Sequence, residues 1–229
     1  MITKKPSERI SVCQTCGECC KRYPISILPH ERSAQARFMG VSEEEFTRTH
    51  TRLLVQLVPF PSSDHPLAIA TAMLPKTLVQ ILESNGLDSP YVMILPMVGL
   101  RKEEYCIFFD ADTFGCTTHP VKPAQCRLFP FTSLKENEDY ATLYDFCGLA
   151  TISSPTQHTF DHQRAQKERM HAYFDAVAKE GLGGVWGTLP LKGNILFRGK
   201  EVSTIRMDEL NEWLSLSRSK TPHFDNHRK

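Results

Sequence analysis

The segment CQTCGECC, residues 13–20, places four cysteines within eight positions and constrains the fold more than any other part of the chain. Its cysteines are Cys13, Cys16, Cys19 and Cys20. Two residues between successive cysteines form a turn that can point both sulfurs toward one metal. The segment therefore predicts a cysteine-ligated site, and the surrounding chain has to leave these sulfurs facing a common centre.

The spacing of the first three cysteines indicates which metal they bind. Cys13, Cys16 and Cys19 form two overlapping C-x2-C steps, which is typical of the run that supplies three ligands to one 4Fe–4S cluster. A structural zinc site more often uses two separate pairs, so zinc is the alternative metal or the metal of a second site. Cys20 directly follows Cys19, and adjacent side chains rarely point to one centre. Cys20 therefore either serves a second site or replaces Cys19 as the ligand.

A second group of cysteines follows about ninety residues later. Cys106, Cys116 and Cys126 are ten residues apart, and Cys147 comes after them. Four early and four late cysteines allow two four-thiolate sites, or one cluster and one zinc, and the number of sites stays open. We expect the metal-binding region to span residues 13–147, with at least one late cysteine completing the early set.

Charge balance and the lengths of the apolar runs indicate the cellular location and the classes of partner that we expect. The 27 Lys and Arg residues nearly balance the 26 Asp and Glu residues, so net charge does not indicate a nucleic acid. No apolar run reaches the length of a membrane span, and the first twelve residues lack the apolar core of a signal peptide. We therefore expect a cytoplasmic protein with no membrane partner. In a reducing cytoplasm, clustered cysteines indicate metal or redox chemistry rather than disulfides.

The rest of the pattern predicts one helix-rich α+β domain over residues 1–229, with a few short strands built around the metal site. Apolar periodicity and capping residues predict helices at 29–40, 41–58, 75–86, 154–181 and 207–217, with a helical turn near 124. Composition predicts strands at 91–98, 105–109 and 140–147, and a hairpin at 193–202. Residues 150–218 form a predicted C-terminal helical extension, and residues 219–229 a flexible tail.

The cysteines and their neighbours resemble a known family. The early segment is followed, in order, by Cys106, Cys116, His119, Pro123, Cys126, Arg127, Phe129 and Pro130. This order resembles the CxxCxxCC family of cysteine-cluster proteins, also called the YkgJ type and described as zinc- or iron-chelating. The resemblance covers residues 13–130 in outline and implies metal binding. Residues 150–229 carry no motif.

The cysteine pattern is also similar, more distantly, to that of flagellin lysine N-methylase, which implies an iron–sulfur cluster and S-adenosylmethionine. On this alternative the chain is a protein lysine N-methylase-like enzyme with a protein substrate. No residue matches a methyl-donor site, and the glycine-rich run EGLGGVWG follows a predicted helix that Gly181 should end. A third alternative is a zinc-stapled interaction module that presents its long C-terminal helix to a protein partner.

Overall fold

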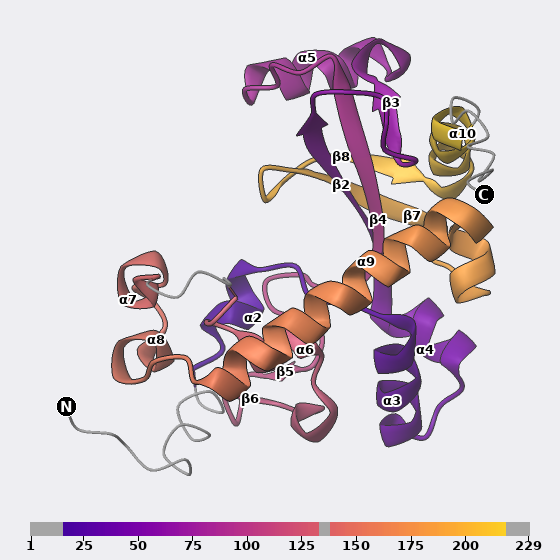
Figure 1. The fold of residues 1–229 in the computed structure, drawn as a ribbon. Helices are drawn as coiled ribbons and strands as arrows, with labels where there is room; N and C mark the ends of the chain where they lie inside the picture. Colours follow the sequence, from indigo (N-terminus) through magenta and orange to yellow (C-terminus); the bar gives the residue numbers. More distant parts are fainter. Residues whose placement is uncertain (1–15, 133–137, 219–229) are drawn as a thin grey trace, which may run out of the picture. The chain divides into compact units, whose positions relative to one another are not determined.

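The computed structural model describes residues 16–132 and 138–218 (Figure 1). It confirms the predicted α+β class. Contacts within the chain define two compact units. The described part of the first, which we call the cysteine unit, holds residues 16–51, 98–132 and 138–173, and that of the second, the sheet unit, holds residues 52–97 and 174–218. That the chain is one domain stays a prediction.

The helices are α2 (Glu18–Arg22), α3 (Pro29–Met39), α4 (Glu43–His50), η1 (Thr71–Met73), α5 (Lys76–Ser84), η2 (His119–Val121), α6 (Ala124–Leu128), α7 (Tyr140–Leu143), α8 (Gly148–Ile152), α9 (Gln157–Trp186) and α10 (Met207–Arg218). The strands are β1 (Ser26–Ile27), β2 (Thr51–Phe60), β3 (Ala68–Ala70), β4 (Tyr91–Leu100), β5 (Phe109–Asp110), β6 (Gly115–Cys116), β7 (Lys192–Phe197) and β8 (Lys200–Arg206). No helix in residues 16–132 and 138–218 is long and apolar enough to cross a membrane.

The sheet unit contains the strands in the order β4-β2-β7-β8, with β3 paired to β4. β2 and β7 are parallel, with Leu53 opposite Gly193, and β7 and β8 form an antiparallel hairpin. A Cβ atom at Gly193 would lie 2.5 Å from the Leu53 Cβ atom, so only glycine fits at this close approach. Leu53, Leu57 and Ile195 are buried and contribute to the core of this unit.

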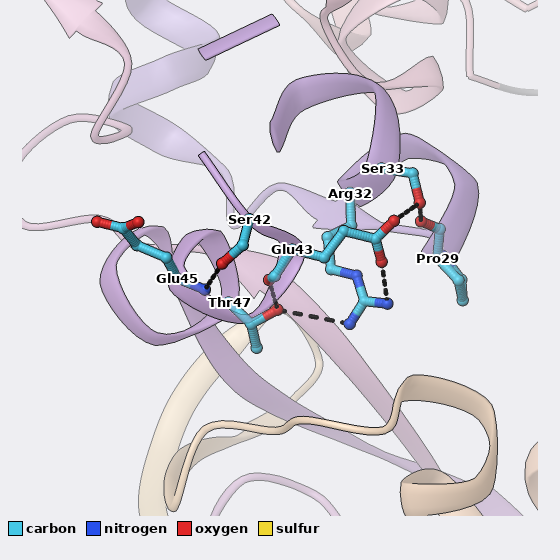
Figure 2. Close-up of polar contacts among 7 residues, drawn as sticks. All are labelled: Pro29, Arg32, Ser33, Ser42, Glu43, Glu45 and Thr47. Atoms are coloured by element: carbon cyan, nitrogen blue, oxygen red, sulfur yellow. Dashed lines mark hydrogen bonds and ion pairs between the residues drawn. The ribbon is translucent and has the colours of Figure 1, made fainter. Parts of the chain in front are cut away.

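In the cysteine unit, α3 and α4 are held together by polar contacts around Glu43 (Figure 2). The Glu43 carboxylate accepts hydrogen bonds from Ser33 Oγ at 2.5 Å and from Arg32 Nη2 at 2.5 Å. The hydroxyl of Ser33 and the Arg32 guanidinium lower the pKa of this carboxyl. Ser42 caps α4 by accepting the backbone N–H of Glu45, as the sequence predicts.

The structure contradicts the predicted helix at 41–58 and the predicted strand at 140–147. The helix ends at His50, and strand β2 begins at Thr51 because residues 51–57 are mostly buried on both faces and pair with β7. The second segment forms α7, whose first turn is capped by the Asp139 side chain accepting the Thr142 N–H. In the predicted strand 105–109, only Phe109 enters a strand, β5.

The remaining elements confirm the predictions, with small shifts at their ends. Helices α3, α5, α6 and α10, strand β4 and the β7–β8 hairpin lie where the sequence places them. The long helix α9 begins at Gln157, three residues later than predicted, and Gly181 breaks it with a φ of 82°. Gly181 is therefore a helix stop, as expected. Pro96 interrupts nothing, since β4 continues through it.

Candidate metal centre

Gly17 positions the helix that carries Cys19 and Cys20. It stands before α2 with a φ of 68°, in the left-handed region that favours glycine. A Cβ atom here would lie 2.3 Å from Cε2 of Phe109, so the ring of Phe109 covers the backbone of Gly17. The glycine inside CQTCGECC is therefore required both by its backbone angle and by an aromatic ring from the late cysteine segment.

Two of the late cysteines are brought to α2 by backbone hydrogen bonds. The N–H of Cys106 donates to the carbonyl oxygen of Cys20 at 3.0 Å. Phe109 then pairs with Cys116 across the β5–β6 hairpin, and Cys116 Sγ lies 3.6 Å from Thr118 Oγ1. The two cysteine segments, ninety residues apart in sequence, thus meet in one unit.

Cys126 lies on α6, which two side-chain contacts anchor to β1 and α3, the elements that follow the early cysteine segment. Oε1 of Gln125 accepts the N–H of Ser26 at 2.8 Å, so strand β1 is tied to α6. The carboxylate of Glu31, on α3, accepts the N–H of Ala124 at 2.6 Å. Its other oxygen accepts the N–H of Leu28 at 2.8 Å. Glu31 is 5% exposed, so this buried carboxylate satisfies the first turns of both α3 and α6.

A cavity of about 320 Å³ opens beside α2 and α6, and Cys19 and Cys126 both line it. Its other walls are Tyr23, Ile25, Gln125, Phe129, Thr132 and Tyr144. The aromatic rings form one cluster, with centroids 5.5 Å apart for Tyr23 and Phe129 and 4.8 Å apart for Phe129 and Tyr144. Cys19 and Cys126 therefore face a common, mostly apolar space.

A second cavity, of about 20 Å³, is also lined by Cys19. Cys16, Cys19 and Cys147 line it, together with Gly17, Glu18, Phe129, Phe146, Gly148 and Leu149. Cys147 is buried at the start of α8, in a cluster with Phe131 and Tyr140. Cys19 borders both cavities, whereas Cys20 borders neither, although the two thiols share a hydrogen bond.

Burial and the neighbouring cysteines raise the pKa of several of these thiols. A hydrogen bond with Cys20, followed by burial, raises the pKa of Cys19 well above its usual range. Burial, with smaller contributions from Cys116 and Cys19, raises the pKa of Cys106 to about 11. Burial also raises the pKa of Cys126, and the neighbouring Cys19, Cys106 and Cys116 add to the effect. Bringing a metal cation to such thiols reverses this balance, because the cation stabilises thiolates.

Burial is likewise the main cause of the raised pKa of Cys147, and Cys16 and Cys19 raise it further. Cys19 thus interacts with two groups, one with Cys106, Cys116 and Cys126 and the other with Cys16 and Cys147. Lys122 acts in the opposite direction and lowers the pKa of Cys126. The donor chemistry of the unit, several neighbouring thiols with a lysine nearby, suits a thiolate-bound metal.

All seven described cysteines are free thiols, while Cys13 lies outside the described residues. Among the residues that the structure describes, no three Cys, His, Asp or Glu side chains are already arranged to hold a metal ion. The seven described candidate ligands share the cysteine unit, and none of them lies in the sheet unit. Which of them bind the metal stays a prediction.

Several residues at the site were not predicted from the sequence. The capping role of Glu31 and the bridging role of Gln125 leave no pattern in the sequence, because their partners are about a hundred residues away. Tyr144 and Phe146 lie in the segment 140–147, which the sequence predicts as a strand. Arg127, next to Cys126, donates to the carbonyl oxygen of Lys122 at 2.8 Å.

Comparison with known families agrees with this geometry. Residues 12–148 match a family model described as "CxxCxxCC: Putative zinc- or iron-chelating domain". The chain belongs to the CxxCxxCC family. The matched residues include both cysteine segments and end one residue after Cys147. Membership supports metal binding by the CxxCxxCC region. No curated protein and no solved structure matches the chain.

Proposed function

We propose that the chain is a metalloprotein in which the early and late cysteines together hold one 4Fe–4S cluster. The proposed ligands are Cys13, Cys16, Cys19 and Cys126. The observation that supports this most is that Cys19 and Cys126, from distant segments, line one cavity of about 320 Å³. Cys16 precedes Cys19 by one C-x2-C step, and Cys13 precedes Cys16 by another.

The chain's own residues would serve such a cluster in two ways. The rings of Tyr23, Phe129 and Tyr144 form an apolar wall that limits the access of water, which tunes a cluster's reduction potential. Lys122 favours the thiolate form of Cys126 and so offsets part of the negative charge of the ligands. When bound, the cluster supplies one-electron transfer. The buried carboxylate of Glu31 contributes by fixing the start of the helix that carries Cys126.

Zinc is a second candidate, and a separate observation favours it. In their thiolate forms Cys19, Cys106, Cys116 and Cys126 would repel one another, which puts these four cysteines in one electrostatic neighbourhood, although no three of the described ones are already arranged around a metal. Four thiolates are a standard structural zinc site. In that case the metal would staple the two segments together and contribute to folding. The methylase-like activity, and a protein partner or protein substrate, stay predictions from the cysteine pattern.

Metal analysis of protein purified without oxygen distinguishes the two candidates. We expect a brown protein with broad visible absorption and about four iron and four sulfide per chain. A colourless protein with zinc and no iron would overturn the cluster proposal and support the zinc site. Reconstitution with iron and sulfide after purification provides a control for cluster loss during handling.

A further inference from the structure

Helix α9 carries two exposed histidines on one face, outside the cysteine segments. His158 and His162 are four positions apart, a spacing that places side chains next to each other on a helix. Their ring centroids are 4.2 Å apart, with the ring planes inclined at 59°. Within the described part of the chain, no hydrogen bond or ion pair engages either imidazole. Both rings therefore have nitrogen lone pairs available to a ligand.

We propose that His158 and His162 form a second metal site, which binds a divalent first-row transition metal such as Zn²⁺, Ni²⁺ or Cu²⁺. Neutral imidazole is a good ligand for these ions, and their usual geometries can be completed by water. The helix holds the two rings side by side before any metal arrives, so chelation requires little more than rotation of the side chains. This site shares no residue with the proposed cysteine ligands and does not depend on their identity.

The charged residues beside the two histidines indicate what kind of metal site these can form. Asp161 lies between the two histidines in sequence, and its Oδ1 accepts from Gln157 Nε2 at 2.9 Å and from Arg164 Nη1 at 3.2 Å. The carboxylate is thus engaged with other partners, and we assign it no ligand role. The negative charge of Asp161 favours a metal cation nearby, whereas the positive charge of Arg164 opposes one. Two imidazoles with water in the remaining positions make an exchangeable surface site rather than a structural one.

Calorimetric titration with NiCl₂ tests the site, using the full-length chain without a histidine tag and with its cysteine centre loaded. At about pH 7.5, where imidazole is mostly neutral, we expect one dominant nickel-binding event per chain. The double variant His158→Gln/His162→Gln should lose it. The matched control is His171→Gln, which removes an exposed histidine of α9 that has no histidine four positions away, and it should bind as the unmodified chain does.

Unchanged nickel binding in the double variant, or its loss in His171→Gln, would overturn the proposal. A lack of any nickel event in the unmodified chain would overturn it as well. Glutamine is a good helix former, so circular dichroism should show the same helix content in all variants. Iron, zinc and sulfide contents should not change in the double variant, which separates this test from that of the cysteine centre.

Discussion

The ring of Phe109 covers Gly17, so that a Cβ atom at position 17 would lie 2.3 Å from the ring carbon Cε2. Phe109 is also stacked on Tyr105, with ring centroids 4.4 Å apart, and is held in the β5–β6 hairpin by pairing with Cys116. The ring therefore has little freedom to move away. This contact joins the two cysteine segments without any metal, and we expect it to contribute to the free energy of unfolding.

Gly17→Ala should destabilise the protein more than Gly40→Ala. Both glycines have a φ near 70°, but a Cβ atom at Gly40 meets nothing within 4 Å. Alanine in the left-handed region costs about 1 kcal/mol at either position, and the clash with Phe109 adds roughly 1–3 kcal/mol at position 17 only. Urea unfolding measures the difference. Equal losses of unfolding free energy in the two variants would show that alanine at position 17 does not clash with Phe109.

A double variant locates the source of the extra loss. In Gly17→Ala/Phe109→Ala the clash is absent, so the two changes should cost less than the sum of the single variants. Strict additivity of the unfolding free energies would mean that Gly17→Ala acts through its backbone angle alone.

Glu31→Ala should destabilise the cysteine unit and reduce its metal content. The change leaves the buried N–H groups of Leu28 and Ala124 without the acceptors that Glu31 supplies, which costs about 2–4 kcal/mol. Glu44→Ala, at an exposed position in the first turn of α4, is the matched control and should change stability by less than about 0.5 kcal/mol. Thermal unfolding and metal analysis of both variants would show whether Glu31 has this role; similar values for the two would exclude it.

Protonation of His50 should make the protein less stable in mild acid. The His50 ring packs against the rings of Phe46 and Phe108, with centroids 5.2 and 5.5 Å away. Burial, and then the charge of Arg101, lower its pKa from the usual 6.5. The unfolded chain therefore binds this proton more readily than the folded one. The stability from His50 is present above about pH 6.5 and is lost as the pH falls through the lower folded-state pKa.

His50→Phe keeps the stack and removes the proton, so its melting temperature should fall less between about pH 7.5 and 5 than that of the unmodified chain. His65 and His119 also have lowered pKa values, so the melting temperature of both proteins should still fall somewhat with decreasing pH. His171→Gln serves as the control and should show the same fall as the unmodified chain. If the melting temperature of His50→Phe falls as much with decreasing pH as that of the unmodified chain, His50 does not contribute to the acid sensitivity.

The sequence predicts the meeting of the cysteine segments but not how they meet. The spacing of Cys13, Cys16 and Cys19 is local information, and so is the helical turn around Cys126. The anchor between α3 and α6 is not local, because nothing in the residues around Glu31 indicates that its carboxylate will reach Ala124. Such long-range contacts follow from packing and leave no spacing pattern.

The two wrong predictions of secondary structure have different causes. Leu53, Leu54 and Leu57 fit one face of a helix, but they equally suit a strand that is buried on both sides. The pairing of β2 with its neighbours β4 and β7 decides between them. In the segment from Tyr140 to Cys147, alternation suggests a strand, whereas the Asp139 cap starts a helical turn. A local cap outweighs a weak alternation over so few residues.

We propose that one metal is held jointly by the early and late cysteines, through Cys19 rather than Cys20. The metal content per chain of Cys126→Ser and Cys20→Ser, prepared side by side without oxygen, tests this proposal most directly. Cys126 lines the larger cavity with Cys19, while Cys20 lines neither cavity. We expect Cys126→Ser to lose most of its metal and Cys20→Ser to retain it. Full metal content in Cys126→Ser, or its loss in Cys20→Ser, would overturn the proposal.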